Sequence, residues 1–320
     1  MAGSVLLLTD ARMDAHVAEG HPERPSRRLA AADGVRDAAG DGLREEPVEP
    51  ASDEAITRTH APAYIQLLAE ADARGGAWLD PDTYVGPGSL SAARLAAGAT
   101  IRAARAAAGG EARVAFAVVR PPGHHAAASR GSGFCLLNNI AMAAVALRAE
   151  GVAQRIAIVD WDVHHGDGTQ QVFDADPDLL YASTHQHPFY PGTGAPHERG
   201  IGEASGTKLN RPLAAGDGDE AFVSSWTDDL LPAVEAFAPE AILVSAGYDA
   251  HRADPLAGLD VTEDGYETVA RSLGVIVERL GLGGVALTLE GGYDLDALRA
   301  SVAATVRGLL DGMAGRSEGA

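Results

Sequence analysis

Continuous runs of apolar residues recur along the chain, separated by longer stretches of helical composition. Six of these runs are SVLLLT, RVAFAVV, RIAIVDW, LLYAST, EAILVSA and VALTLE. A strand that is apolar at successive positions is covered on both faces, which is typical of a parallel sheet between two layers of helices. The runs therefore predict a mainly parallel central sheet.

The segments between the runs have the composition and spacing of helices. We expect helices at residues 89–108, 139–150, 220–237, 264–280 and 295–313. Strands that alternate with helices indicate an α/β fold with helices on both faces of the sheet. Because no repeat, linker or charge block divides the sequence, we expect a single domain over residues 1–320, with a frayed tail from about residue 315.

The charge of the chain restricts the class of function. The formal net charge is −20, from 45 acidic and 25 basic side chains, and Lys208 is the only lysine. A surface of this charge repels nucleic acid and anionic membranes, so we expect no direct contact with either. The negative field favours cationic substrates, but acidity more often serves solubility, so charge alone identifies no partner and no oligomeric state.

Cysteine content and the start of the chain bear on its location. Cys135 is the only cysteine, so a disulfide within the chain is excluded. No apolar run is as long as a membrane span, and MAGSVLLLTD lacks the basic segment of a signal peptide. We therefore expect a cytoplasmic protein. Cys135 is expected to be a small buried residue rather than a nucleophile, because nothing in the sequence marks its thiolate as stabilised.

Polar residues directly follow four of the apolar runs. RPPGHH follows AFAVV, DWDVHHGDG follows IAIV, YDAHRADP follows AILVSAG, and GGYD follows VALTLE. Because ligands of open parallel sheets bind beyond the carboxyl ends of the strands, these residues are expected to meet at one rim. A single such residue is more often a cap or a turn residue, but four strand ends together indicate a functional site.

The segment DWDVHHGDG contains candidate metal ligands. If the strand stays extended through His164, then Asp160, Asp162 and His164 point to the same face. Asp162 and His164 form a natural pair of ligands, and Asp249 from another strand end supplies a third. Two carboxylates and one imidazole at an open site suit a divalent metal, either zinc or ferrous iron. The metal would lower the pKa of a bound water and polarise a carbonyl.

The remaining strand ends supply candidate acid–base groups. His124 and His125 are placed for general acid–base function, with Asp160 and Asp167 as partners that fix their tautomers. Tyr293 is placed to donate its hydroxyl to a developing oxyanion. These groups together suit the attack of water on an amide or a similar carbonyl. The other histidines are expected in loops or at the surface: His16, His60, His185, His187, His197 and His251.

In order along the chain, these motifs resemble the zinc-dependent histone deacetylase family, which includes bacterial deacetylase-like amidohydrolases and acetylpolyamine amidohydrolases. The matching segments are HPERPSR (21–27), RPPGHH (120–125), GFCLLNN (133–139), DWDVHHGDGTQ (160–170), YPGTG (190–194), SAGYDAHRADPLAG (245–258) and LEGGYD (289–294). They span nearly the whole chain, and the joint pattern is closer to class II members than to class I members. The resemblance implies an arginase/deacetylase fold.

The resemblance also implies a role for each polar residue at the strand ends. The zinc ligands would be Asp162, His164 and Asp249. His125 would be the general base and then the acid that protonates the leaving amine, while His124 gives electrostatic support. Asp160 would support His124 and Asp167 would support His125, while Tyr293 polarises the acyl carbonyl. His165 should point away from the metal.

Further positions follow from the same resemblance. The structural potassium ion that family members bind near the zinc would be held by Asp160, Asp162, His164, Ser183 and Thr184. The tunnel for the acyl-lysine side chain would be lined by Gly133, Phe134, Tyr190 and Leu256.

Two departures from related patterns narrow the interpretation. Arginases share the fold but carry a second metal-binding aspartate at the position of Gly166, so a site for a single divalent metal follows. Polyamine-selective members have a glutamate where this chain has Leu256, which favours an acyl-lysine or an uncharged substrate, although an acidic residue from another loop could replace the glutamate. Tyr293 argues against the class II members that have histidine there and act poorly on acetyl-lysine.

The sequence thus predicts a cytoplasmic zinc amidohydrolase that removes an acetyl or longer acyl group from an amine. One alternative is the same chemistry on a small molecule, such as an acetylated polyamine or a biosynthetic intermediate. Another is a metal-binding module that recognises acyl-lysine without turnover. His124, His125 and Tyr293 speak against the module, because a binding protein has no use for groups that transfer protons.

Overall fold

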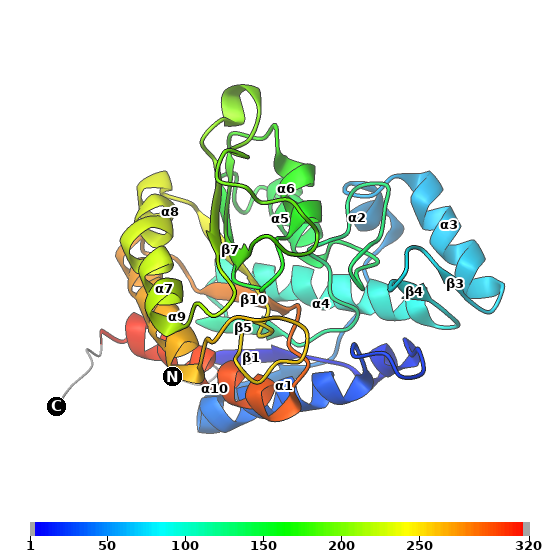
Figure 1. Ribbon diagram of the computed structural model, residues 1–320, viewed down its shortest axis with the longest axis horizontal. Helices are drawn as coiled ribbons and strands as arrows, with labels where there is room; N and C mark the ends of the chain where they lie inside the picture. The colour runs from blue at the N-terminus through cyan, green and yellow to red at the C-terminus, as the bar shows by residue number, and fades with distance from the viewer. Residues whose placement is uncertain (1–3, 316–320) are drawn as a thin grey trace.

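An eight-stranded parallel sheet forms the centre of the computed structural model, which describes residues 4–315 (Figure 1). The strand order is β2-β1-β5-β10-β9-β6-β7-β8, and every neighbouring pair is parallel. The strands are β1 (Val5–Leu8), β2 (Leu43–Glu46), β5 (Val114–Ala117), β6 (Ile156–Asp160), β7 (Leu179–Gln186), β8 (Lys208–Leu213), β9 (Ala241–Ala246) and β10 (Val285–Leu289). The predicted parallel sheet is confirmed, whereas the predicted frayed tail, from residue 316 on, lies outside the described residues.

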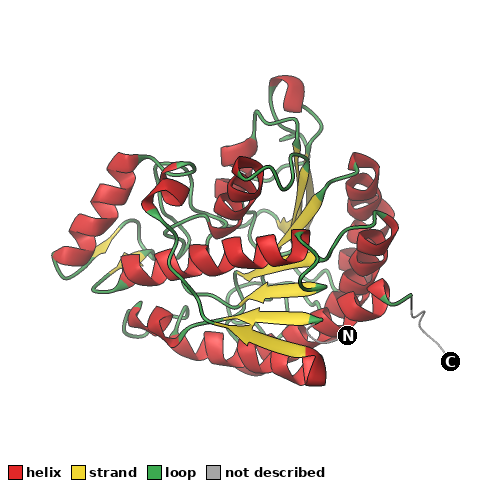
Figure 2. Ribbon diagram, turned by 180° about the vertical axis from the view of Figure 1, so that it is seen from behind, coloured by secondary structure: helices red, strands yellow, loops and turns green. Residues whose placement is uncertain are grey.

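Helices cover both faces of the sheet (Figure 2). They are α1 (Pro25–Ala39), α2 (Asp53–Thr57), α3 (Pro62–Ala73), α4 (Ser89–Ala108), α5 (Asn139–Ala149), α6 (Asp167–Phe173), α7 (Asp219–Ser224), α8 (Leu231–Phe237), α9 (Glu263–Arg279) and α10 (Leu295–Met313). The segment predicted as one helix at 220–237 is α7, a π-helical stretch over Ser225–Leu230, and α8. Two short strands, β3 (Ala77–Trp78) and β4 (Tyr84–Val85), form a separate antiparallel hairpin.

The alternation of side chains along each strand produces two hydrophobic cores. In β1, Leu6 and Leu8 belong to the core that contains α4 and α5, whereas Val5 and Leu7 belong to the core that contains α1, α9 and α10. Successive strand residues point to opposite faces, so a strand covered by helices on both sides must be apolar at every position. This requirement explains the continuous apolar runs.

The outermost strand β8 carries the chain's only lysine. The side chain of Lys208 is fully buried, and its ammonium donates hydrogen bonds to the carbonyl oxygens of Asp176 (3.1 Å) and Leu179 (2.8 Å). Burial lowers the pKa of Lys208 to about 8.

Within residues 4–315, no helix is both long and apolar enough to cross a bilayer.

Candidate active site

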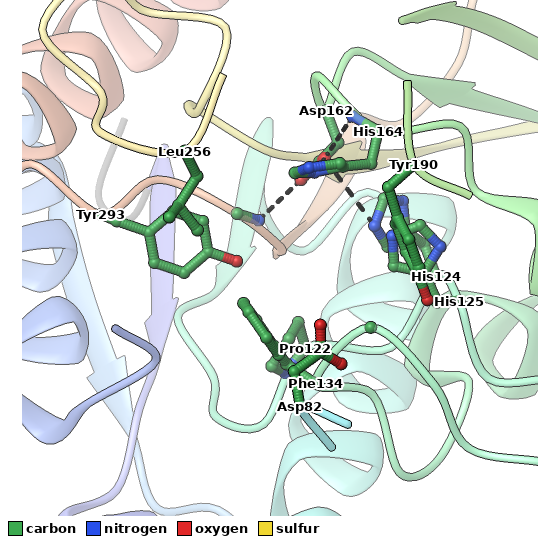
Figure 3. Close-up of a pocket in the computed structure, with 12 residues that line it drawn as sticks. Asp82, Pro122, His124, His125, Phe134, Asp162, His164, Tyr190, Leu256 and Tyr293 are labelled. Carbon is green, nitrogen blue, oxygen red and sulfur yellow. Dashed lines mark hydrogen bonds and ion pairs between the residues drawn. The ribbon is translucent and has the colours of Figure 1, made fainter. Parts of the chain in front are cut away.

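A pocket beyond the carboxyl ends of β5, β6, β9 and β10 collects the residues that the sequence places at the strand ends (Figure 3). It is lined by Asp82, Pro122, His124, His125, Gly133, Phe134, Asp162, His164, Tyr190, Leu256, Gly291 and Tyr293. All four predicted tunnel residues are among them. Asp82, Pro122 and Gly291 were not predicted from the sequence.

The chain bends directly after β6, so the expectation of an extended strand through His164 is wrong. The strand ends at Asp160, and Asp162 to His164 form a bend. The bend is held by carboxylates: Asp162 Oδ1 accepts the N–H of His164 (2.9 Å), and Asp249 Oδ1 accepts the N–H of Val163 (3.0 Å). The N–H groups of Val163 and His164 have no partner on a neighbouring strand, and the carboxylates of the candidate ligands Asp249 and Asp162 accept them instead.

Asp162, His164 and Asp249 form a compact group of candidate metal ligands, the metal cluster. His164 Nδ1 lies 3.2 Å from Asp162 Oδ1 and 3.2 Å from Asp249 Oδ2, and one ligand atom from each residue lies within 4.8 Å of the others. Both aspartates are almost fully buried, and among the described residues Asp249 Oδ2 accepts no hydrogen bond. A buried carboxylate oxygen without a donor is costly unless a cation is close, so the cluster fits a divalent metal.

The electrostatics of the cluster support the same conclusion. Burial lowers the pKa of His164, but Asp162 and Asp249 outweigh burial and raise it to about 10. Two buried carboxylates therefore favour a positive charge between them, which a proton on His164 supplies here and a bound cation would supply in its place. Gly291 allows this crowding, because a β carbon there would lie 2.0 Å from Asp249 Oδ2, and its N–H donates to Asp162 Oδ2 (2.7 Å).

His124 and His125 follow β5 and pair with different aspartates. His124 Nδ1 lies 3.1 Å from Asp160 Oδ2, His125 Nδ1 lies 2.8 Å from Asp167 Oδ1, and the two ring centroids are 4.0 Å apart. Burial and the charge of His124 lower the pKa of His125 to about 4. Burial also opposes the charge on His124, but Asp162 and Asp160 overcome it and hold the pKa of His124 well above its usual range.

Gly166 has no room for a side chain. A β carbon at this position would lie 2.3 Å from Asp160 Oδ2 and 2.7 Å from the hydroxyl of Tyr181, which itself donates to Asp160 Oδ2 (2.9 Å). His165 lies next in the chain, and its two ring nitrogens are 2.8 Å from Thr193 Oγ1 and 3.0 Å from Gln170 Oε1. Both imidazole nitrogens of His165 thus have hydrogen-bond partners outside the metal cluster.

Tyr293 lies in the loop after β10 and points its hydroxyl into the pocket (Figure 3). Its ring contacts Phe134 edge to face (5.8 Å between centroids), and the guanidinium of Arg27 lies 4.6 Å from its centre. Its backbone N–H donates to Asp254 Oδ2 (2.6 Å). Burial raises the pKa of Tyr293 well above its usual range, although Arg27 opposes the shift, so the hydroxyl keeps its proton.

Aromatic rings form much of the wall around the metal cluster. Tyr190 lies edge to face with His125 (5.2 Å), and Phe189 stacks on His164 (5.4 Å between centroids, 18° between planes). Phe189 was not predicted. It directly precedes Tyr190 and the YPGTG segment, so a position near the pocket could have been inferred from the sequence. Gly133 adopts a φ of +54°, and a β carbon there would lie 2.4 Å from the His125 ring. A larger residue at Gly133 would therefore displace His125.

Ser183 and Thr184 lie on β7, the strand that pairs with β6. Ser183 is opposite Asp160 in the strand register, and Thr184 Oγ1 accepts a hydrogen bond from Trp226 Nε1 (3.0 Å). The next residue, His185, is buried within β7, so its predicted loop or surface position is wrong. Its Nδ1 lies 2.9 Å from Ser183 Oγ, and this polar partner explains how a histidine is accommodated in a buried strand.

His60 and Cys135 are buried near the site without lining it. His60 Nδ1 lies 3.1 Å from the carbonyl oxygen of Ala127, and its Nε2 accepts the N–H of Asn138 (2.9 Å). Burial lowers the pKa of His60 to about 4. Cys135 is fully buried, as predicted, and burial raises the pKa of its thiol well above the usual range, which excludes a ready nucleophile.

Two solved structures share this architecture. The HD domain of HDA15 superposes with a TM-score of 0.90 and 37% sequence identity, covering 96% of this chain and 88% of that one. Acetylpolyamine aminohydrolase from Burkholderia pseudomallei superposes with a TM-score of 0.86 and 31% identity, covering 96% of this chain and 98% of that one. The fold and the site together define a protein of the arginase/deacetylase fold.

Sequence comparison narrows this class to one family. The histone deacetylase domain matches residues 21–309. A probable deacetylase of Archaeoglobus fulgidus is 40% identical over 301 residues, which are 92% of this chain and 82% of that protein. The chain belongs to the histone deacetylase family, and the resemblance drawn from its motifs is confirmed.

Proposed function

We propose that the chain is a zinc-dependent amidohydrolase that removes acetyl or longer acyl groups from acyl-lysine or a similar acylated amine. The observation that carries the proposal is the Asp162–His164–Asp249 cluster, of which Asp162 and His164 line one pocket with His125 and Tyr293. Metal ligands, a neutral imidazole and a protonated phenol are the groups that amide hydrolysis by water requires.

The metal would be held by Asp162, His164 and Asp249, and it would lower the pKa of a water molecule and polarise the amide carbonyl. Two carboxylates and one imidazole suit zinc, and also ferrous iron. A potassium ion would be held by Asp160, Asp162, His164, Ser183 and Thr184. The register that sets Ser183 opposite Asp160 supports this assignment.

His125 is the group that would move the proton. It is neutral at neutral pH, because burial lowers its pKa to about 4, and its Nδ1 faces Asp167, which leaves Nε2 for the pocket. It would take a proton from the attacking water and return that proton to the leaving amine as the C–N bond breaks. His124, held in its charged form by Asp160 and Asp162, would stabilise the negative charge that develops.

Tyr293 would act on the opposite side of the amide. Its hydroxyl keeps its proton and points into the pocket, so it can donate a hydrogen bond to the acyl oxygen as that oxygen gains charge (Figure 3). Contacts with Phe134 and Arg27 restrict the ring to this position. The donor is therefore in place before the substrate arrives.

The apolar walls of the pocket favour an acyl-lysine side chain. Phe134, Tyr190 and Leu256 surround the path to the metal cluster, and such walls suit the methylene groups of lysine. A small cationic amine is a second candidate, because the exposed carboxylate of Asp82 also lines the pocket. The structural similarity to an acetylpolyamine aminohydrolase supports this alternative.

A hydrolysis panel tests both candidates. The substrates are an acetyl-lysine peptide, longer acyl-lysine peptides, acetylspermidine and acetylputrescine, each measured with the zinc-loaded protein, with a chelator, and after zinc is restored. We expect release of the acyl group that the chelator abolishes and zinc restores, and the preferred substrate identifies the class. A zinc-loaded protein that binds the acetyl-lysine peptide but releases no acetate would instead be a binding module.

A further inference from the structure

Glu290 is a fully buried carboxyl group that the proposed mechanism does not use. It directly follows β10 and comes three residues before Tyr293, and its side chain has no exposed surface. A buried carboxylate is costly unless donors satisfy its oxygens. The partners of Glu290 therefore indicate its role.

The carboxylate binds the backbone of the loop that carries the histidine pair. Glu290 Oε2 accepts the N–H groups of Gly123 (2.6 Å) and His124 (3.1 Å). Glu290 Oε1 accepts the hydroxyl of Ser245 on β9 (3.1 Å). A side chain from the end of β10 thus connects the end of β9 to the RPPGHH loop after β5.

This loop has few backbone donors of its own. Pro121 and Pro122 have no N–H group, so Gly123 and His124 supply the first amide donors after Arg120. Both residues are buried, and a buried N–H that loses its acceptor costs about 1–3 kcal/mol. Water cannot replace Glu290 as the acceptor of these two N–H groups unless the loop opens. The carboxylate therefore determines where the backbone of His124 lies.

The cluster around Glu290 is a hydrogen-bonded group and not a second metal site. His124, Cys135 and Glu290 each place a potential ligand atom within 4.8 Å of the others. However, Glu290 Oε2 already accepts two N–H groups, His124 Nδ1 faces Asp160, and the raised pKa of Cys135 keeps its thiol protonated. Burial raises the pKa of Glu290 to about 7, against the opposing effects of the His124 charge and the Gly123 N–H.

We infer that Glu290 is a positioning residue for the histidine pair: by accepting the N–H groups of Gly123 and His124, it sets where the imidazoles of His124 and His125 stand relative to the metal cluster. The consequence for catalysis rests on the proposed function. The restraint on the loop does not, and it can be measured separately.

The test compares Glu290→Met, which has a similar size but no oxygen, with Glu290→Gln, which keeps an acceptor. For Glu290→Met we expect about tenfold faster amide exchange of residues 121–126 by mass spectrometry, about tenfold lower kcat, and KM within about twofold of wild type. Glu290→Gln should recover both exchange and kcat to within about threefold of wild type. Ser245→Ala, which removes the third hydrogen bond but keeps the acceptor of both N–H groups, is the matched control, and its effects on exchange and kcat should be smaller than those of Glu290→Met.

Two results would overturn the inference: wild-type exchange of residues 121–126 in Glu290→Met, or a loss in Glu290→Gln as large as that in Glu290→Met. If Glu290→Met does not fold, Glu290→Asp carries the same test, because a carboxylate that is one methylene shorter cannot reach both N–H groups. If the wild-type protein releases no acyl group from any substrate, the proposed function fails, while the exchange measurement still decides whether Glu290 holds the loop.

Discussion

Replacing Gly166 with alanine tests how firmly the site depends on the position of Asp160. Gly166 has φ −74° and ψ 66°, a conformation open to alanine, so the backbone itself resists little. The new β carbon, however, would lie 2.3 Å from Asp160 Oδ2, 2.7 Å from the hydroxyl of Tyr181 and 3.1 Å from His124 Nδ1. The three groups around Gly166 cannot all keep their positions.

The size of the displacement sets the expected effect. Moving Asp160 Oδ2 from 2.3 Å to an ordinary contact of 3.4 Å requires a shift of about 1 Å. Asp160 orients His124, and a misplacement of about 1 Å in a catalytic arrangement costs on the order of 100-fold in rate. Overpacking of a buried position costs about 1–3 kcal/mol of unfolding free energy. Gly166→Ala should therefore lower kcat about 100-fold and reduce stability by about 1–3 kcal/mol.

Steady-state kinetics on the best substrate of the panel and unfolding in urea measure the two effects. Gly258→Ala is the matched control, because its β carbon would lie 3.5 Å from the nearest atoms, an ordinary contact, and it should change neither quantity appreciably. If Gly166→Ala keeps kcat within about threefold and unfolds like the wild type, then Asp160 does not need its present position and the reasoning is wrong.

Three further outcomes are expected. Tyr293→Phe should bind zinc like the wild type and lose about 100- to 1000-fold in kcat, since only the oxyanion donor is removed; normal turnover would refute that role. Asp249→Ala should lose zinc itself, as measured by metal analysis after dialysis, because one of three ligands is gone. Burial lowers the pKa of His60 to about 4, so folded His60 binds fewer protons than unfolded His60 between about pH 4 and 6.5. The contribution of His60 to stability therefore falls as the pH falls through this range. The stability difference between wild type and His60→Gln should therefore shrink by about 2 kcal/mol from pH 7 to pH 5 in urea unfolding, and an unchanged difference would contradict it.

The elements predicted from the sequence are those that lie deepest in the fold. The six apolar runs form inner strands. Each inner strand contributes side chains to the cores on both faces of the sheet, as β1 does with Leu6 on one face and Leu7 on the other. The outermost strands β2 and β8 were missed, since LREE and KLNRPL each have a neighbour on one side only and are partly exposed. Helix α1 was missed because its buried residues include Arg27 and Arg28, which hide the apolar periodicity.

The candidate site was predictable where its residues belong to motifs at strand ends. Asp162, His164 and Asp249 come together because parallel strands end at one edge of the sheet. The groups that hold the site in place were not predictable in the same way. Glu290 and Asp254 act through backbone N–H groups of loops far away in the sequence, and such contacts depend on the tertiary structure. Asp82 reaches the pocket from the β3–β4 hairpin, which no pattern placed beside the rim.

The burial of Lys208 protects the folded chain from chemical modification at lysine. Its ε-ammonium is bound by the carbonyl oxygens of Leu179 on β7 and of Asp176 in the segment before β7, and the sequence contains no other lysine. The folded chain therefore offers no exposed lysine ε-amine to acetyl phosphate or to an activated thioester. In a lysate where other proteins accumulate acyl-lysine, Lys208 of the folded chain should therefore stay unacylated. The pocket of one copy would then meet no acyl-lysine on another copy of the chain.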